Sequence, residues 1–154
     1  MAKTVVLSPS APDPIGPYSQ AIAAGNMLFV SGQIAIRQQS GQMITEDIEA
    51  ETEQVMQNIG SILQAAGMDF SNVVKCSIFL SDFASFQKVN GVYGKYFPVQ
   101  PPARETVEVS RLPKDANIEI SCIAEKSSRK IGISSLSVLS HHPADRSVQG
   151  GSLS

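Results

Sequence analysis

The polar residues most able to carry chemistry are those that interrupt apolar segments of the chain. Arg104 begins a β-branched segment after Pro101-Pro102-Ala103, and Glu119 lies between two isoleucines. A planar guanidinium can hold a small carboxylate through two parallel hydrogen bonds, and a glutamate can move a proton or activate water. The pair therefore indicates chemistry on a small carboxylic acid, and a surface or interfacial salt bridge is the alternative interpretation.

Histidine is missing from the part of the chain that could form a core. Both histidines, His141 and His142, follow the last periodic segment, so residues 1–126 contain none. A Ser-His-Asp or Cys-His arrangement and an imidazole metal ligand are therefore excluded for a fold that ends near 126. Cys76 and Cys122 lie in apolar segments without a CxxC spacing, and we predict that both are buried, inert thiols.

Three further positions combine a functional interpretation with a simpler one. Tyr18 follows Ile15-Gly16-Pro17 and is either a packed aromatic or part of a binding site. Ser31-Gly32-Gln33 interrupts an apolar strand, which indicates a bulge or a point where a ligand approaches the backbone. Asn90 lies in a helical segment among apolar residues, and its simpler interpretation is an exposed polar position.

Charge and hydropathy exclude several classes of partner. The formal net charge is −2, the isoelectric point is about 5.6, and no run of Lys and Arg is present. Strong binding to a nucleic acid phosphate backbone is therefore not expected. No apolar stretch approaches the roughly 18 residues of a membrane span. The sequence predicts a cytoplasmic protein without a membrane partner and leaves a mitochondrial or other organellar location open.

The elements that must position these residues follow from apolar periodicity and turn signals. Two short apolar segments around Gly25-Asn26 predict a hairpin within residues 21–36. Recurrence at three and four residues predicts helices, the first of which should end at Gly67. The predicted helices are 46–66 and 82–97, and the further predicted strands are 72–80, 104–110 and 118–124. In the second helix one apolar stripe is formed by Phe86, Val89, Tyr93 and Phe97.

This order predicts an α+β fold with a single mixed sheet and two helices on one face. Because two helices cover only one face, and the strand near residue 30 is apolar on both sides, the other face should meet a second copy of the chain. Alternation places Arg104 and Thr106 opposite Val107, and Glu119 opposite Ile118 and Ile120. If the apolar residues of each strand face the helices, then Arg104, Thr106 and Glu119 project from the helix-free face. We therefore expect these three residues at the subunit interface of a homo-oligomer.

The last segment has a different composition. Nine of the 28 residues from 127 to 154 are Ser, and none is aromatic. The sequence predicts one domain over residues 1–126 and a Ser-rich tail over 127–154 that is mostly disordered.

Several motifs together resemble the RidA/YjgF/UK114 family of reactive-intermediate imine deaminases. The resemblance covers about residues 3–126. It implies a chorismate-mutase-like α+β fold, assembled as a homotrimer with a cleft at each subunit interface. The matching motifs, in order, are Ile15-Gly16-Pro17-Tyr18-Ser19-Gln20-Ala21, Phe29-Val30-Ser31-Gly32-Gln33-Ile34, Asn72-Val73-Val74-Lys75, Val89-Asn90-Gly91-Val92-Tyr93, Pro102-Ala103-Arg104, and Leu112-Pro113-Lys114 through Ile118-Glu119-Ile120.

The resemblance also implies an activity and residue roles. The activity is hydrolysis of enamine/imine intermediates such as 2-aminoacrylate to a 2-keto acid and ammonia, without a metal or organic cofactor. By the resemblance, Arg104 binds the substrate carboxylate and Glu119 positions or activates water. The residues that would line the cleft are Tyr18, Ser31, Gly32, Asn90 and Thr106. Thr106 stands where many members have Cys, so a role for a thiol is in doubt.

Two other functions stay open at this stage. Some relatives are described as endoribonucleases and translation inhibitors, against which the acidic isoelectric point and the absent core histidine argue. A non-catalytic trimer that binds a small carboxylic acid, or acts like a chaperone, is the second. The deaminase requires Arg104 and Glu119 to converge on one crevice between protomers. A placement of the two side chains far apart, or on opposite sides of the sheet, would leave the deaminase without a site.

Overall fold

The computed structural model describes residues 2–127, which form one six-stranded mixed sheet. The strand order is β1-β2-β3-β6-β4-β5, and only β4 and β5 run parallel to each other. β1 was not anticipated from the sequence. The strands are β1 (Thr4–Val6), β2 (Ala21–Ala24), β3 (Met27–Gln33), β4 (Val73–Leu80), β5 (Ala103–Glu108) and β6 (Ile118–Glu125).

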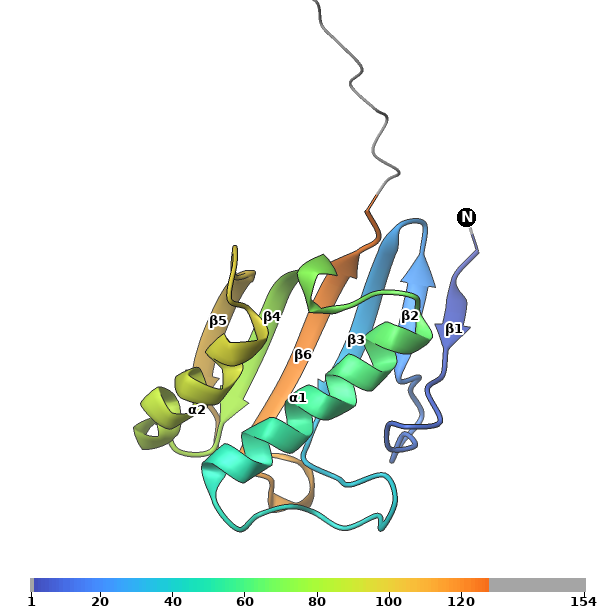
Figure 1. The fold of residues 1–154 in the computed structure, drawn as a ribbon. Helices are drawn as coiled ribbons and strands as arrows, with labels where there is room; N and C mark the ends of the chain where they lie inside the picture. Colours follow the sequence, from blue (N-terminus) through green and yellow to red (C-terminus); the bar gives the residue numbers. More distant parts are fainter. Residues whose placement is uncertain (1, 128–154) are drawn as a thin grey trace, which may run out of the picture.

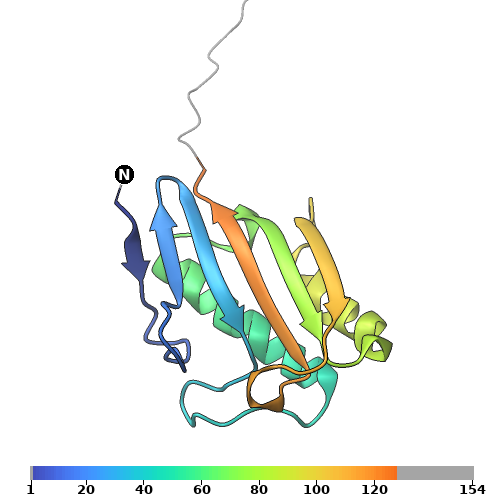
Figure 2. The ribbon, with the colours of Figure 1, turned by 180° about the vertical axis from the view of Figure 1, so that it is seen from behind.

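Both helices cover the same face of the sheet. α1 (Ile48–Ala65) and α2 (Phe86–Tyr93) lie in front of the strands in Figure 1, and the view from behind leaves the strands uncovered in Figure 2. The core lies between this face and the helices, and Leu28, Ile78 and Ile120 are fully buried there. The predicted α+β class with two helices on one face is confirmed.

α1 follows the predicted helix closely because its boundaries have strong local signals. The Asp47 side chain accepts a hydrogen bond from the Ala50 amide at 2.7 Å and caps the N-terminus. Val55, Ile59 and Ile62 face the sheet and are buried. After the helix, Gly67 has φ of +71°, a conformation that favours glycine.

α2 is shorter than predicted. The segment 82–97 begins with a 3₁₀ turn at Phe83–Ser85, continues as the eight-residue α2, and ends with a second 3₁₀ turn at Gly94–Tyr96. The Asp82 carboxylate accepts a hydrogen bond from the Ala84 amide and so caps the first turn rather than a long helix. The apolar stripe of the segment still faces the sheet, with Val89 and Tyr93 buried.

The predicted hairpin strand ends earlier than its apolar residues suggest. β3 pairs with β6 until Val30, and the register shifts before Gln33, which is a β-bulge at Ser31-Gly32. Ile34 and Ile36 are apolar but lie beyond the strand, in a small cluster with Leu112 and Ala116. Burial there, rather than sheet pairing, explains their apolar character.

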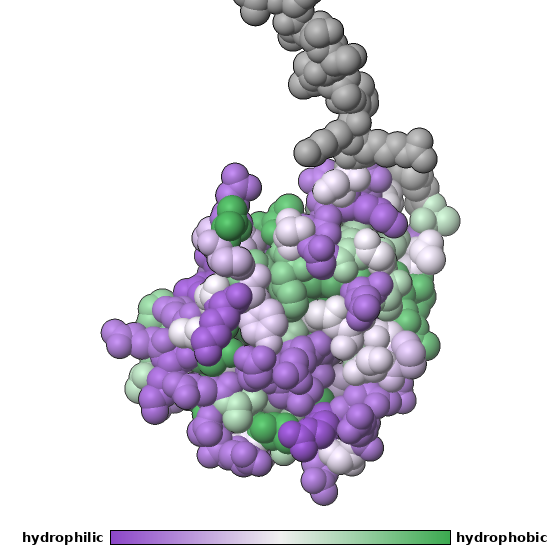
Figure 3. All heavy atoms as spheres, in the orientation of Figure 1, coloured by the Kyte–Doolittle hydropathy of each residue, from purple (hydrophilic) through white to green (hydrophobic). Residues whose placement is uncertain are grey.

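The helix-free face carries exposed apolar side chains, as the two-sided strand predicted. Phe29 is 45% exposed and Val107 is 42% exposed, and Figure 2 shows no helix over their strands. On the other side of the molecule, hydrophilic residues gather over α1 and α2 in Figure 3. The uncovered sheet face is therefore suited to contact another protein surface.

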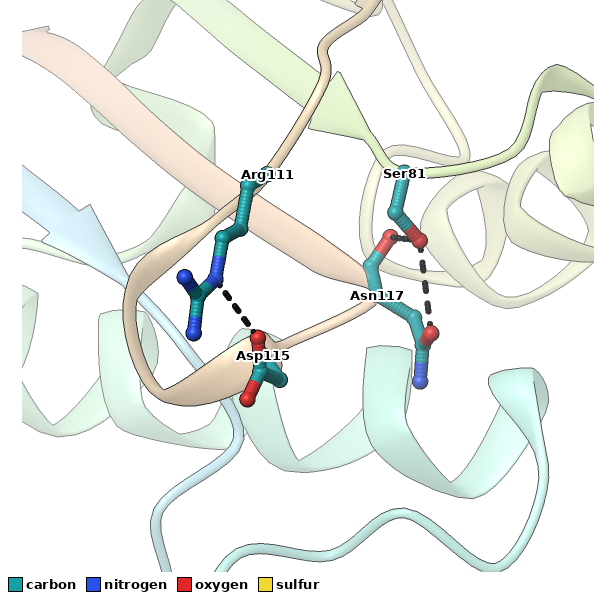
Figure 4. Close-up of polar contacts among 4 residues, drawn as sticks. All are labelled: Ser81, Arg111, Asp115 and Asn117. Carbon is teal, nitrogen blue, oxygen red and sulfur yellow. Dashed lines mark hydrogen bonds and ion pairs between the residues drawn. The ribbon is translucent and has the colours of Figure 1, made fainter.

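The turn between β5 and β6 is held by local polar contacts (Figure 4). The Arg111 Nε donates to Asp115 at 2.7 Å, and both side chains are exposed. The Ser81 hydroxyl, at the end of β4, lies near the Asn117 side chain just before β6. The Ser81–Asn117 contact ties the start of β6 to the end of β4. The Arg111–Asp115 pair is exposed and contributes little to the position of β6.

Two parts of the sequence analysis, the Ser-rich tail and the histidine pair, concern residues that the structure does not describe. Apart from Ser127, the predicted Ser-rich tail lies outside the described residues, as do His141 and His142. Among residues 2–127, neither helix is both long and apolar enough to cross a bilayer.

Candidate functional site

The structure corrects the predicted side of Arg104 and Thr106. Arg104 pairs with Cys76 and Thr106 pairs with Ile78 in the β4–β5 register. Both β4 partners are buried under the helices, and neighbouring residues across a sheet share a face. Arg104 and Thr106 therefore face α2, and the prediction that they project from the helix-free face is wrong.

The error has a physical origin in the edge strand. The sequence analysis assumed that Val107 would face the helices because it is apolar. β5 is the last strand of the sheet, and Val107 instead pairs with Phe79 on the helix-free face, which is itself apolar. When both faces of a sheet are apolar, alternation identifies two faces but does not say which one meets the helices.

Arg104 is supported by aromatic rings of the α2 segment. Its guanidinium carbon lies 5.0 Å from the centre of the Tyr93 ring and 5.6 Å from that of Phe86. Neither of the two salt bridges found within residues 2–127 includes Arg104. The five N–H donors of the guanidinium therefore lack a carboxylate partner in the described chain.

Two buried side-chain oxygens on β5 and α2, the elements that carry and cover Arg104, also lack partners. They are Thr106 Oγ1 and Asn90 Oδ1, and neither has a hydrogen bond among the described residues. The buried Tyr93 hydroxyl lies beside the Cys76 thiol. Burial without a partner costs a polar group free energy, so such a group usually marks a place where a ligand, water or another chain completes the structure. We call Asn90, Arg104 and Thr106 the arginine half-site, and the Tyr93 ring packs against the Arg104 guanidinium.

Glu119 projects from the opposite face and lies against Gly32. In register, Glu119 pairs with Phe79 on the helix-free face. A Cβ atom built on Gly32 would lie 2.5 Å from Glu119 Oε1, so only a residue without a side chain leaves room for this carboxylate. Burial raises the pKa of Glu119. A carboxylate with a raised pKa is a stronger base for moving a proton from water.

Tyr18 and Ser31 lie on the same side as Gly32. Tyr18 and Gly32 line one small hollow, and the Tyr18 hydroxyl accepts a hydrogen bond from the Ile15 amide at 3.3 Å. The Ser31 hydroxyl donates to the Ser19 carbonyl at 2.6 Å, which ties the bulge of β3 to the loop that carries Tyr18. Tyr18, Ser31, Gly32 and Glu119 form what we call the glutamate half-site.

One chain does not bring the two half-sites together. The arginine half-site faces α2, and the glutamate half-site lies on the helix-free side of the same sheet. Two hollows of the described chain contain no predicted site residue: one of about 320 Å³ includes Arg37 and Gln57, and one of about 580 Å³ includes Glu53 and Lys88. A single chain therefore holds Arg104 and Glu119 apart.

The two cysteines are buried, as predicted. Cys76 and Cys122 are direct partners in the β4–β6 register, and both are free thiols. Burial raises the pKa of each thiol, which keeps both in the less reactive protonated form.

Sequence reasoning missed several polar and aromatic residues that shape the two half-sites. Gln20 is 1% exposed, and its amide donates to the carbonyls of Ser8, Ala11 and Pro12, which orders the proline-rich loop before Tyr18. Tyr93 was predicted only as a core residue of a helical stripe. The available signal was its position seven residues after Phe86, which places both rings on one helix face.

The chain is similar to proteins with described activities. Residues 8–126 match the family model described as Endoribonuclease L-PSP. The chain is 50% identical over 122 residues to the chloroplastic Reactive Intermediate Deaminase A of Arabidopsis thaliana, covering 79% of this chain and 65% of that protein. It is 41% identical over 124 residues to the 2-iminobutanoate/2-iminopropanoate deaminase of Homo sapiens, covering 80% of this chain and 90% of that protein. Among solved structures, E. coli TdcF with bound serine has a TM-score of 0.78 and 35% identity, covering 80% of this chain and 99% of that one.

Proposed function

Because the chain belongs to the Endoribonuclease L-PSP (YjgF/RidA) family, we propose that it hydrolyses 2-imino acids to 2-keto acids and ammonia. The observation that carries the proposal is Arg104, a half-buried cation without a carboxylate partner in the described chain, beside buried oxygens that also lack partners. The Arabidopsis relative is described as a reactive intermediate deaminase and the human relative as a 2-iminobutanoate/2-iminopropanoate deaminase, and both descriptions support this chemistry. The substrate class we propose is the 2-aminoacrylate type.

Arg104 would hold the carboxylate of the imino acid. A guanidinium presents two parallel donors that match the two oxygens of a carboxylate. E. coli TdcF, a relative, has been solved with bound serine, an amino acid that carries such a carboxylate. Thr106 lies two residues after Arg104 on β5, and Asn90 lies on α2 between Phe86 and Tyr93, so both would contact the rest of a small substrate through their unpartnered oxygens.

Glu119 would activate the water. The enamine first tautomerises to an imine, whose carbon is electrophilic. Water adds to this carbon while Glu119 accepts one of its protons, and the nitrogen gains protons as the C–N bond breaks. The products are a 2-keto acid and ammonia, and no atom is oxidised or reduced overall. The reaction therefore needs no redox cofactor.

The position of Glu119 depends on Gly32, and this dependence is testable. In a Gly32→Ala variant the new methyl group would displace the carboxylate, because the available distance to Oε1 is 2.5 Å. We expect kcat for imine hydrolysis to fall by about 100-fold, since a displacement of this size disrupts alignment with the bound substrate. A coupled assay that measures keto-acid formation from freshly generated imine tests this.

Gly94→Ala is the matched control for Gly32→Ala. A Cβ atom on Gly94 meets nothing within 4 Å, so its activity should stay close to wild type. Wild-type turnover by Gly32→Ala would contradict the role assigned to the Glu119 position.

We place the complete site between two protomers of a homotrimer. Arg104 lies on the edge strand β5, and Glu119 lies on the uncovered, partly apolar face, so a neighbouring copy can bring one against the other. Each site would then take its arginine half-site from one chain and its glutamate half-site from the next. This arrangement replaces the prediction that both residues project from one face of one chain.

Mixing two inactive variants tests a site shared between protomers. Arg104→Ala and Glu119→Gln chains, coexpressed with different tags, should form mixed oligomers in which some interfaces keep an intact Arg104 and an intact Glu119. Random assembly of equal amounts should restore about a quarter of wild-type activity. Each variant alone should be inactive. Mixed oligomers without recovered activity would show that the two residues do not meet across an interface.

The family description also raises ribonuclease activity as a second candidate. The acidic charge and the absence of histidine from residues 1–126 argue against it. An RNA cleavage assay of purified wild-type protein, with Arg104→Ala to detect a contaminating nuclease, separates the two functions. Cleavage by wild type that is lost in the variant would favour the ribonuclease.

A further inference from the structure

Arg104 is held in place by π-faces and not by negative charge. Its guanidinium carbon lies 5.0 Å from the centre of the Tyr93 ring and 5.6 Å from that of Phe86. Both distances are within the roughly 6 Å over which a cation is attracted to an aromatic face. An aromatic ring attracts the cation without a carboxylate oxygen, so no charge-assisted hydrogen bond to an anion takes up the N–H donors.

The two rings are themselves fixed by neighbours. Tyr93 is only 5% exposed and packs against Phe97 with ring centres 4.8 Å apart. Phe86 stacks on Phe83, also at 4.8 Å between ring centres. Phe86 and Tyr93 are seven residues apart and lie on one face of α2. Both rings therefore contact the Arg104 side chain from the same helix.

We infer that Tyr93 and Phe86 form an aromatic platform that positions Arg104 to receive a carboxylate. The inference rests on the proposed function, in which Arg104 binds the substrate. A carboxylate partner within the chain would also hold the arginine, but it would occupy the donors that the ligand needs. An aromatic platform fixes the guanidinium and leaves those donors free, so less ordering remains to be done when the ligand binds.

The platform predicts different effects for the ring and for the hydroxyl of Tyr93. The hydroxyl is buried beside the Cys76 thiol and makes no hydrogen bond to Arg104, so positioning of Arg104 falls to the ring. Tyr93→Phe keeps the ring and should keep function. Tyr93→Leu keeps an apolar side chain but removes the π-face, and the guanidinium should lose its fixed position.

The expected result is a change in KM rather than in kcat. For Tyr93→Leu we expect KM for the imine to rise about tenfold, equivalent to about 1.4 kcal/mol, with kcat within about twofold of wild type. Tyr93→Phe should stay within about twofold of wild type in both constants. Calorimetric titration with 2-oxobutanoate, a 2-keto acid, should show the same tenfold weakening in Tyr93→Leu alone.

Tyr96→Leu serves as the control for lost packing. Tyr96 packs on Phe70 with ring centres 4.8 Å apart and hydrogen-bonds Glu53 through its hydroxyl. This variant should lower the melting temperature and leave KM unchanged, because the cation–π contacts of Arg104 are with Tyr93 and Phe86.

Two outcomes would overturn the platform. One is a wild-type KM and a wild-type affinity for 2-oxobutanoate in Tyr93→Leu. The other is equal impairment of Tyr93→Phe and Tyr93→Leu, which would assign the effect to the hydroxyl. Failure of the proposed function looks different: wild-type protein would then not hydrolyse imines at all, and the titrations with 2-oxobutanoate would still test the platform.

Discussion

Replacing Arg104 by alanine is expected to lower kcat/KM for 2-imino acids by about 100- to 1000-fold, because the substrate carboxylate loses its charged, two-pronged partner. Arg104→Lys should recover only part of this loss, since an ammonium group offers a point charge without the planar pair of donors. The rate of keto-acid formation, measured with imine generated in place by a dehydratase, gives the comparison. Affinity for 2-oxobutanoate should fall in parallel.

Arg111→Ala is the matched control for this substitution. Arg111 is exposed and pairs with Asp115 in the turn before β6 (Figure 4), and neither residue belongs to a half-site. Its loss removes the same charge from the chain but should leave kcat/KM near the wild-type value. Equal activity in Arg104→Ala and wild type would reject Arg104 as the substrate-binding residue.

Replacing Glu119 by glutamine is expected to lower kcat by about 100- to 10,000-fold, the range that a positioned general base contributes. Glutamine keeps the size of the side chain and the space over Gly32, so ligand binding should persist. Ammonia release and calorimetric titration with 2-oxobutanoate, measured on the same preparation, separate the two effects. Retained binding with lost turnover favours an enzyme over a non-catalytic carboxylate-binding protein.

The pH dependence of activity should report the same residue. Burial raises the pKa of Glu119 above that of an ordinary glutamate. Because only the ionised form accepts a proton, wild-type activity should rise as the pH rises through this raised pKa. The residual activity of Glu119→Gln should not fall at acid pH in this way. An unchanged fall in the variant would assign the pH dependence to another group.

Folding stability should not explain a loss of activity in Glu119→Gln. A carboxyl group whose pKa is raised by burial is penalised in the folded state once it is ionised. The penalty is absent below the pKa of the unfolded chain and complete above that of the folded chain. Removal of the charge should therefore leave the melting temperature unchanged or higher at neutral pH. Glu105 is exposed and pairs with Lys75, and Glu105→Gln is the control for removal of a charge.

Local sequence signals predicted most of the fold because they do not depend on distant contacts. The N-terminal cap of α1, the apolar repeat along the helix and the glycine that ends it lie within one segment, and the helix appears where they place it. Alternation in β6 likewise identified Ile118 and Ile120 as core residues. β1, a three-residue strand, was missed because it is too short to show a period.

These local signals did not determine from which side of the sheet each residue of the edge strand β5 projects. Alternation in β5 separates Arg104 and Thr106 from Val107, but the choice of side depends on which residues of β4 pair with them. Val107 packs beside apolar neighbours on the uncovered face, so its apolar character did not show which face of the sheet it occupies. The packing of Tyr93 under Arg104 also depends on how α2 crosses the sheet, which no segment encodes alone.

The placement of the two half-sites on opposite sides of one sheet makes the proposed activity depend on protein concentration. A chain diluted until it dissociates from its neighbours would keep its fold and both half-sites but would lose every intact site. Specific activity should then fall steeply on dilution, while circular dichroism of the same samples stays constant. In a cell, the amount of protein made would set a threshold below which imines accumulate even though each chain is correctly folded.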